Sequence, residues 1–313
     1  MGAQSTIIDP SRKSLAQNKT KKILEDAEKG GYGIIASIVY NIENIVAVVR
    51  AAENKRSPLI IQVFPWAITA SDGLLVRAAA DAAARASVPI AIHLDHAQDE
   101  ALIRHAADNL PFDSIMVDMS HHEKEENLAK TKELVEYCHA RGIATEAEPG
   151  RLEGGEDGVA DTVDLEGVLT TPEDVEQFIE TGVDFLAPAF GNIHGESPYG
   201  NAGPQLDYAR QDIRFVLSKA IRRLEAIKKQ ANGRVRIVAH GTNEWPDDVT
   251  QRVIQAGVSK INVNRLVLDD YLKHFRANAA KMPLTKLIDE GIQHTTRQQE
   301  EQMDVACSTG KAN

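Results

Sequence analysis

Short apolar segments recur along the chain, and most are followed by a stretch whose apolar residues fall at helical spacing. Several segments are continuous apolar runs rather than alternations, which is typical of parallel strands with helices on one side and a core on the other. A strand–helix unit repeated eight times closes most simply into one (β/α)8 TIM barrel. The strands are expected at residues 33–39, 58–64, 89–95, 114–119, 144–148, 185–190, 236–240 and 260–264.

The polar, amphipathic residues 13–29 predict an extra N-terminal helix that could plug the bottom of the barrel. Two long connections, residues 150–171 and 191–207, are rich in glycine, as loops that close over a substrate often are. No linker interrupts the pattern, so we expect a single domain over residues 1–313, with the barrel at about 31–290 and a polar tail that frays after Arg297. Further helices are expected at residues 41–55, 72–87, 99–109 and 123–141.

Composition narrows the class of protein. With 42% hydrophobic residues, the 313-residue chain can bury a large core. Its net charge of −11 disfavours nucleic acid and anionic membranes as partners, and requires local positive charge or a metal wherever an anionic substrate binds. We expect a cytoplasmic protein with Cys138 and Cys307 reduced, since no segment is typical of a membrane span or a signal peptide.

Residues that can bind metal or move protons stand at the ends of the predicted strands, which open onto one face of a barrel. His96, His194 and His240 end three different strands, and three imidazoles with an open position favour a catalytic divalent site, most naturally zinc. A regular pleat would put His93 and Asp95 on one face and His96 on the other. Asp95 and His96 can therefore share the site only if the strand ends between them, and His93 is the main rival ligand.

Three acidic residues are further candidates. Asp118 and Glu148 also end strands, where they could hold a basic side chain, orient the histidines from behind, or form an alternative metal position. Glu156 lies in the first glycine-rich loop; in isolation it is a solvated acid, but in a loop that closes over a carbonyl it is a candidate base. His121 and His122 remain competing ligands.

A series of short motifs, in order and spacing over about residues 12–290, resembles the class II metal-dependent fructose-bisphosphate aldolases together with the tagatose-bisphosphate aldolases. The motifs are Asn41-Ile42-Glu43-Asn44, His93-Leu94-Asp95-His96, Met116-Val117-Asp118-Met119-Ser120-His121, Glu146-Ala147-Glu148-Pro149-Gly150, Gly154-Gly155-Glu156-Asp157, Gly191-Asn192-Ile193-His194-Gly195, His240-Gly241 and Lys260-Ile261-Asn262-Val263.

The resemblance implies a ligand set and a division of roles. His96, His194 and His240 would bind zinc, and Asp118 and Glu148 match positions tied to a second or alternate metal position. A homodimer or homotetramer is also implied.

The resemblance further implies the proton steps. Asp95 would handle the proton of the C4 hydroxyl, Glu156 the proton at the nucleophilic carbon, and Asn262 would contact the enediolate derived from the ketose. The chemistry is consistent, because cleavage next to a carbonyl needs an electron sink and a metal supplies one.

The departures from the family concern phosphate. The family's Gly-Ala-Ser-Gly type loop reads Gly241-Thr242-Asn243-Glu244 here, which brings in a carboxylate; Asn264-Arg265, Phe64-Pro65-Trp66 and Ile38 also differ. Arg265 could bind an anion bidentately or pair with Glu244. The expected substrate-binding residues are Asn262, Gly195, Gly241, Thr242, Asn264 and Arg265.

The sequence thus predicts a zinc-dependent aldolase of carbohydrate metabolism that cleaves a ketose phosphate, such as the glycolytic fructose 1,6-bisphosphate, into dihydroxyacetone phosphate and an aldehyde. A metallohydrolase on the same fold is one alternative, but it would usually carry a His-x-His pair in the first strand, which residues 33–39 lack. A non-catalytic sugar-phosphate binder is the other alternative. It predicts that some of Asp95, Glu156 and the three histidines are replaced, but all five are present.

Overall fold

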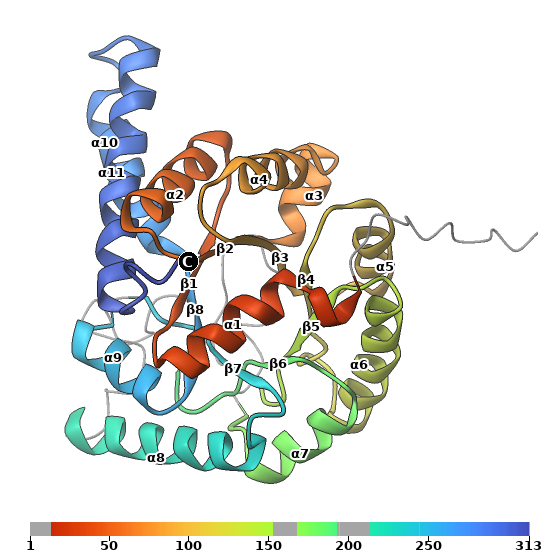
Figure 1. Ribbon diagram of the computed structural model, residues 1–313. Coiled ribbons are helices and arrows are strands. Elements are labelled where there is room, and N and C mark those ends of the chain that lie inside the picture. The colour runs from red at the N-terminus through yellow and green to blue at the C-terminus, as the bar shows by residue number, and fades with distance from the viewer. Residues whose placement is uncertain (1–13, 153–167, 193, 195–212, 244, 313) are drawn as a thin grey trace, which may run out of the picture.

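The computed structural model describes residues 14–152, 168–192, 194, 213–243 and 245–312. Eight parallel strands close into a barrel in chain order, with helices around it, so the predicted TIM barrel is confirmed (Figure 1). The strands are β1 (Ile34–Ile38), β2 (Leu59–Val63), β3 (Ile90–Ala97), β4 (Ser114–Val117), β5 (Ala144–Ala147), β6 (Phe185–Leu186), β7 (Arg236–Ala239) and β8 (Val258–Val263).

The helices follow the strands as a βα repeat requires. They are α1 (Lys19–Gly30), α2 (Ile42–Lys55), α3 (Pro65–Ser71), α4 (Leu74–Arg85), α5 (Glu100–Asn109), α6 (Lys124–His139), α7 (Pro172–Glu180), α8 (Ile213–Ala231), α9 (Asp247–Gln255), α10 (Arg265–Asn278) and α11 (Leu284–Val305), preceded by a 3₁₀ turn (Leu15–Gln17). Helix α4 confirms the helix expected over residues 72–87, whereas α3 before it was not expected; Asp72 and Gly73, which both have positive φ, separate the two. No helix in the described part of the chain is long and apolar enough to cross a membrane.

The strands divide the core into two layers. Outward side chains such as Ile61, Leu94 and Ile115 pack with the surrounding helices. Inward side chains near the strand beginnings, including Ile34 and Met116, pack against α1. The continuous apolar runs in the sequence therefore reflect strands buried on both faces.

Helix α1 plugs the N-terminal end of the barrel, as the sequence suggested (Figure 1). Its N-cap Asn18 accepts a hydrogen bond from Lys21 N and donates to the carbonyls of Asp113 and Gly142, at 2.6 and 3.0 Å. Ile23 and Leu24 of α1 are buried against the inward side chains. Helix α1 thus covers the end of the barrel where the strands begin.

The predicted fraying after Arg297 is wrong. Helix α11 continues to Val305 and packs against α2 and α10, with Met303 fully buried. Beyond the helix, the backbone nitrogens of Gly310 and Ala312 donate to carbonyls at the end of α2, each at 2.8 Å. Most polar residues of this segment lie on the outer side of an amphipathic helix, and Gln299 is buried and hydrogen-bonded to Ser37, so overall polarity was a misleading guide to order. Cys138 is buried and Cys307 exposed, so no disulfide joins them, as expected.

Candidate active site

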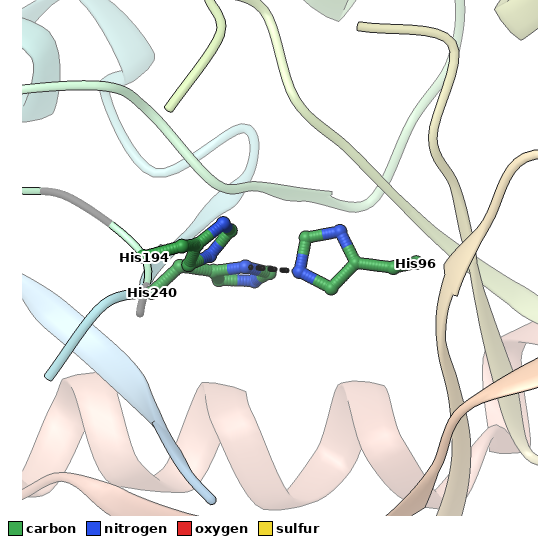
Figure 2. A group of neighbouring side chains, drawn as sticks. All are labelled: His96, His194 and His240. Atoms are coloured by element: carbon green, nitrogen blue, oxygen red, sulfur yellow. Dashed lines mark hydrogen bonds between the residues drawn. The ribbon is translucent and has the colours of Figure 1, made fainter. Parts of the chain in front are cut away.

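Three histidines converge at the C-terminal end of the barrel. His96 lies one residue before the end of β3, His194 follows β6, and His240 directly follows β7; all three are buried. Their candidate ligand nitrogens lie within 4.8 Å of one another, and His240 Nδ1 is 3.0 Å from His96 Nε2 (Figure 2). The structure therefore brings together the three histidines that the sequence placed at one site.

Asp95 and His96 both face this site, but for a structural reason that differs from the one expected. The strand does not end between them, because β3 runs on to Ala97. Instead β3 has one extra residue relative to β4 between Leu94 and Ala97, and His96 has a left-handed φ of 46°. Such a bulge re-aims a side chain, so two consecutive residues can face one site. The left-handed region is costly for a residue with a Cβ, and its use here is consistent with a functional constraint.

The rival His93 lies apart from this cluster. Its Nδ1 is 2.8 Å from Ser114 Oγ, which in turn contacts Thr20 Oγ1 of α1 at 2.9 Å. Its Nε2 is 3.5 Å from Glu146 and 3.8 Å from Asp95, within a separate group of possible ligands. His93 thus belongs to the polar interior below the three histidines.

Carboxylates hold two of the imidazoles from behind. Asp118 Oδ2 lies 2.8 Å from His96 Nδ1, while its Oδ1 accepts hydrogen bonds from the backbone and hydroxyl of Ser120. Glu146 Oε1 lies 2.9 Å from His240 Nε2. An ionised carboxylate can only accept, so His96 Nδ1 and His240 Nε2 donate, and the other nitrogen of each ring is left to bind a proton or a metal ion. These are the nitrogens that face each other in Figure 2.

Glu148 accepts fewer hydrogen bonds from described residues than Asp118 does. Its Oε1 accepts from Leu152 N at 2.8 Å, and its buried Oε2 has no hydrogen-bond partner among the described residues. Together with His96 and Asp118 it forms a second group whose ligand atoms lie within 4.8 Å of one another. The geometry is compatible with both interpretations of the pair, as a support for His96 and as an alternate metal position.

The electrostatics of the cluster favour a bound positive charge. Burial tends to lower the pKa of His96, but the Asp95 carboxylate and the hydrogen bond to Asp118 raise it to about 10. Burial and the nearby Asp118 raise the pKa of Glu148 to about 8. Burial, together with the neighbouring imidazoles, holds the pKa of His194 well below its ordinary value. In the absence of a metal, the site thus carries its positive charge on a protonated His96 beside Asp95 and Asp118, while His194 is neutral.

These residues fit a metal ion. The Nε2 atom of His194 is buried without a hydrogen-bond partner in the described ranges. His96 Nε2 and His240 Nδ1 face each other at 3.0 Å, a position that either a shared proton or a metal ion can occupy. Three imidazole nitrogens with carboxylates behind them form a donor set that suits zinc.

Asp95 lies beside the cluster and is fully buried. It accepts hydrogen bonds from Asn262 Nδ2 at 3.0 Å and from Gln62 Nε2 at 3.3 Å. Asn262 also lies 3.1 Å from His240 Nε2, so the amide bridges the carboxylate and the histidines. The structure therefore brings these two predicted site residues together.

Four of the expected substrate-binding residues, Gly241, Thr242, Asn264 and Arg265, lie just after β7 and β8 at the same end of the barrel. Gly241 has a φ of 63°, and Thr242 donates to the carbonyl of Asn262. Asn264 Oδ1 accepts from Tyr40 at 2.7 Å, and Arg265 Nε lies 3.6 Å from Asp269 in the same helix. Gly195, Glu156 and Glu244 lie outside the described residues.

Two of the positions that depart from the family, Ile38 and Phe64, are apolar and buried. Ile38 and Phe64 are each 1% exposed. The Phe64 ring lies 6.2 Å from the His96 ring and 6.3 Å from that of Tyr40. An aromatic side chain therefore lies beside His96 on this side of the site.

Sequence reasoning missed three residues that build the site: Glu146, Lys260 and Asn192. Asn192 donates to the carbonyl of His240 at 2.8 Å and accepts from Phe190 N, which ties the end of β6 to that of β7. Glu146 and Lys260 stand two positions before Glu148 and Asn262, on the same side of their strands. This spacing of two residues from a predicted site residue could have indicated Glu146 and Lys260 from the sequence.

A parallel barrel with this histidine cluster at its C-terminal mouth has the architecture of an enzyme. The chain belongs to the class II fructose-bisphosphate aldolase family, whose model matches residues 18–311. The resemblance inferred from the motifs is therefore confirmed.

Individual relatives cover nearly the whole chain. A Coccidioides immitis protein provisionally named a fructose-bisphosphate aldolase is 51% identical, over 96% of this chain and 96% of its own. Streptococcus pyogenes fructose-bisphosphate aldolase is 34% identical, over 93% and 98% of the two chains.

Solved structures give the same result. A Coccidioides immitis crystal structure under the same provisional name superposes with a TM-score of 0.87 at 52% identity, covering 95% of this chain and 98% of that one. The YdjI aldolase of Escherichia coli K12 superposes with a TM-score of 0.78 at 27% identity, covering 94% and 98%. The chain is thus similar along its length both to named fructose-bisphosphate aldolases and to a differently named aldolase.

Proposed function

We propose that this protein is a zinc-dependent aldolase that cleaves a carbon–carbon bond of a ketose phosphate. Fructose 1,6-bisphosphate is the default substrate, and it would yield dihydroxyacetone phosphate and an aldehyde. The observation that carries the proposal is the convergence of His96, His194 and His240 beside Asp95, in a chain of the class II aldolase family.

The three histidines would hold the metal. When bound, zinc supplies a Lewis acid that stabilises negative charge developing on the carbonyl and hydroxyl oxygens of the ketose. Asp118 and Glu146 orient two of the rings, and Glu148 offers an alternate position to a second ion.

Asp95 is the group assigned to the C4 hydroxyl. The amides of Gln62 and Asn262 hold its carboxylate in place by donating to it. Asp95 would accept the hydroxyl proton as the C3–C4 bond breaks and return it in the reverse reaction. Asn262 would also donate to the oxygens of the three-carbon fragment.

Glu156 is assigned the proton at the nucleophilic carbon on the basis of the family motif Gly154-Gly155-Glu156-Asp157. A cytoplasmic location and a homodimer or homotetramer remain predictions from the sequence and the resemblance.

The direct test is a cleavage assay on purified protein with fructose 1,6-bisphosphate and other ketoses, before and after chelation and after zinc is restored. We expect chelation to abolish cleavage and zinc to restore it. Asp95→Ala should retain zinc yet lose about 10²–10⁴-fold in kcat. Ketose phosphate binding without cleavage of any ketose would contradict the proposal and favour the non-catalytic binder.

A further inference from the structure

A lysine with no exposed surface lies inside the barrel beneath the histidine cluster. Lys260 Nζ is 2.8 Å from Glu146 Oε2, and both side chains are 0% exposed. The other oxygen, Glu146 Oε1, faces His240 Nε2 at 2.9 Å. A continuous line of contacts thus runs from an ammonium in β8, through a carboxylate in β5, to a histidine at the end of β7.

Strand register explains how two non-adjacent strands meet. Lys260 pairs with Ile34 of β1 and Val238 of β7, and both of these side chains belong to the cluster of inward residues. Glu146 likewise pairs with inward Met116 and Phe185. Both charges therefore project into the barrel interior, one layer below the mouth.

Stability does not account for this pair. The interior of a TIM barrel is ordinarily filled by branched apolar side chains. Burying two charges has a desolvation cost that can exceed their attraction, and apolar or neutral replacements of similar size are often as stable or more so. An ion pair at this depth calls for another role.

The groups around Glu146 indicate that role. His93 Nε2 is 3.5 Å from Oε2, while Asn262 Nδ2, near His240 Nε2, donates to Asp95. The His240 Nε2–H therefore has Glu146 as its acceptor, which leaves Nδ1 directed at His96. The arrangement matches that of Asp118 behind His96, except that Asp118 is held by Ser120 and Glu146 by a full positive charge.

We propose that Lys260 is a positioning residue for the metal site: it fixes the Glu146 carboxylate, which fixes the ring orientation and tautomer of His240 and so sets the affinity for zinc. The inference rests on the proposed metal site. It assigns a function to two buried charges that would not touch the substrate.

The experiment compares zinc affinity with folding stability in Lys260→Met and in the neutral double variant Glu146→Gln/Lys260→Met. Zinc dissociation constants are measured without substrate by competition with a chromophoric chelator, and stability by urea unfolding of the metal-free protein. Groups that orient a metal-bound histidine typically contribute 10–100-fold to affinity, so we expect zinc binding about 10–100-fold weaker in both variants. The double variant should be as stable as the wild type or more so, because it leaves no unpaired buried charge.

Lys22→Met is the matched control, since its side chain is 70% exposed in a surface pair with Asp26; it should bind zinc as the wild type does. If Lys260→Met does not fold, the double variant decides. A folded variant that binds zinc with wild-type affinity would overturn the inference and leave the proposed function intact. A wild-type protein that binds no zinc would overturn both.

Discussion

Two of the three clustered imidazoles are held from behind by a carboxylate: His96 by Asp118 and His240 by Glu146. His194 has a buried Nε2 with no hydrogen-bond partner in the part of the chain described. The three rings therefore differ: a carboxylate orients each of two, whereas His194 has a ring nitrogen that no described residue engages and that is free to bind an ion.

At this scale we expect His194→Ala to lose zinc and activity together while remaining folded. The side chain lies in the site rather than in either apolar cluster, so its removal leaves the core packing intact. Zinc content by elemental analysis, with circular dichroism for folding, is the measurement. His122→Ala, on a side chain 27% exposed beside Glu126, serves as a control and should keep its zinc. Full zinc occupancy in His194→Ala would shift the ligand set toward His96, Asp118 and Glu148.

At the scale of helices and strands, one carboxylate, that of Asp184, links helix α1 to the start of β6. Asp184, immediately before β6, binds His139 Nε2 and Thr145 N, each at 2.8 Å, and also pairs with Lys21 of α1. Burial tends to raise the pKa of Asp184, but His139 and Lys21 outweigh it and hold the pKa below 3.8. The plug at the barrel bottom thus depends on an ionised group.

Asp184→Asn should lower the free energy of unfolding by about 1–3 kcal/mol at pH 7, since several buried donors lose a charged acceptor. A lowered folded-state pKa gives stability that is present above the unfolded pKa and lost as pH falls through the folded one. The difference between variant and wild type should therefore shrink below about pH 4. Urea unfolding at a series of pH values measures it, with Asp26→Asn as the exposed control. A difference independent of pH would show that charge is not the cause.

Helix α11 is a second case at the element scale, since it encloses Met303, a fully buried side chain. Met303→Ala should cost about 2–5 kcal/mol, the usual range for emptying a core position. Glu301→Ala, on the exposed face of the same helix, should change stability by no more than about 0.5 kcal/mol. Thermal or urea unfolding compares them, and equal effects would mean that the C-terminal segment does not contribute to the core.

For the molecule as a whole, the negative net charge and the positions that depart from the family's phosphate-binding motifs both disfavour binding of a doubly phosphorylated substrate. The chain carries a net charge of −11, and the apolar Phe64 ring lies beside His96. Arg265 already has an acidic neighbour, Asp269. These residues therefore supply little positive charge to neutralise a substrate with two phosphates.

We accordingly expect poor turnover of fructose 1,6-bisphosphate relative to a ketose with fewer or differently placed phosphates. A carboxylate at residue 244 within ~4 Å of a phosphate would repel it by ~1 kcal/mol even in bulk water. The measurement is kcat/KM for bisphosphate, monophosphate and free ketoses, in the wild type and in Glu244→Ser, which should improve the bisphosphate selectively. Wild-type efficiency on the bisphosphate equal to that on the other ketoses would contradict this prediction.

The barrel and the histidine cluster could be predicted because the ends of parallel strands meet at one face, however far apart they are in sequence. Glu146 and Lys260 could not be paired in this way, since their contact depends on the register of two strands that are not neighbours. The order of the C-terminal segment was missed because α11 gains its stability from α2 rather than from local sequence.

The left-handed residue in β3 limits how this site could be transplanted. A designer who copied the three histidines and Asp95 onto a barrel with regular strands would turn His96 into the outer helical layer, because consecutive residues in a regular strand face opposite sides. The graft must carry the extra residue between Leu94 and Ala97 as well. Removing one residue from that stretch of the native chain should likewise abolish metal binding while leaving the barrel able to close, a loss that no substitution elsewhere in the strand would repair.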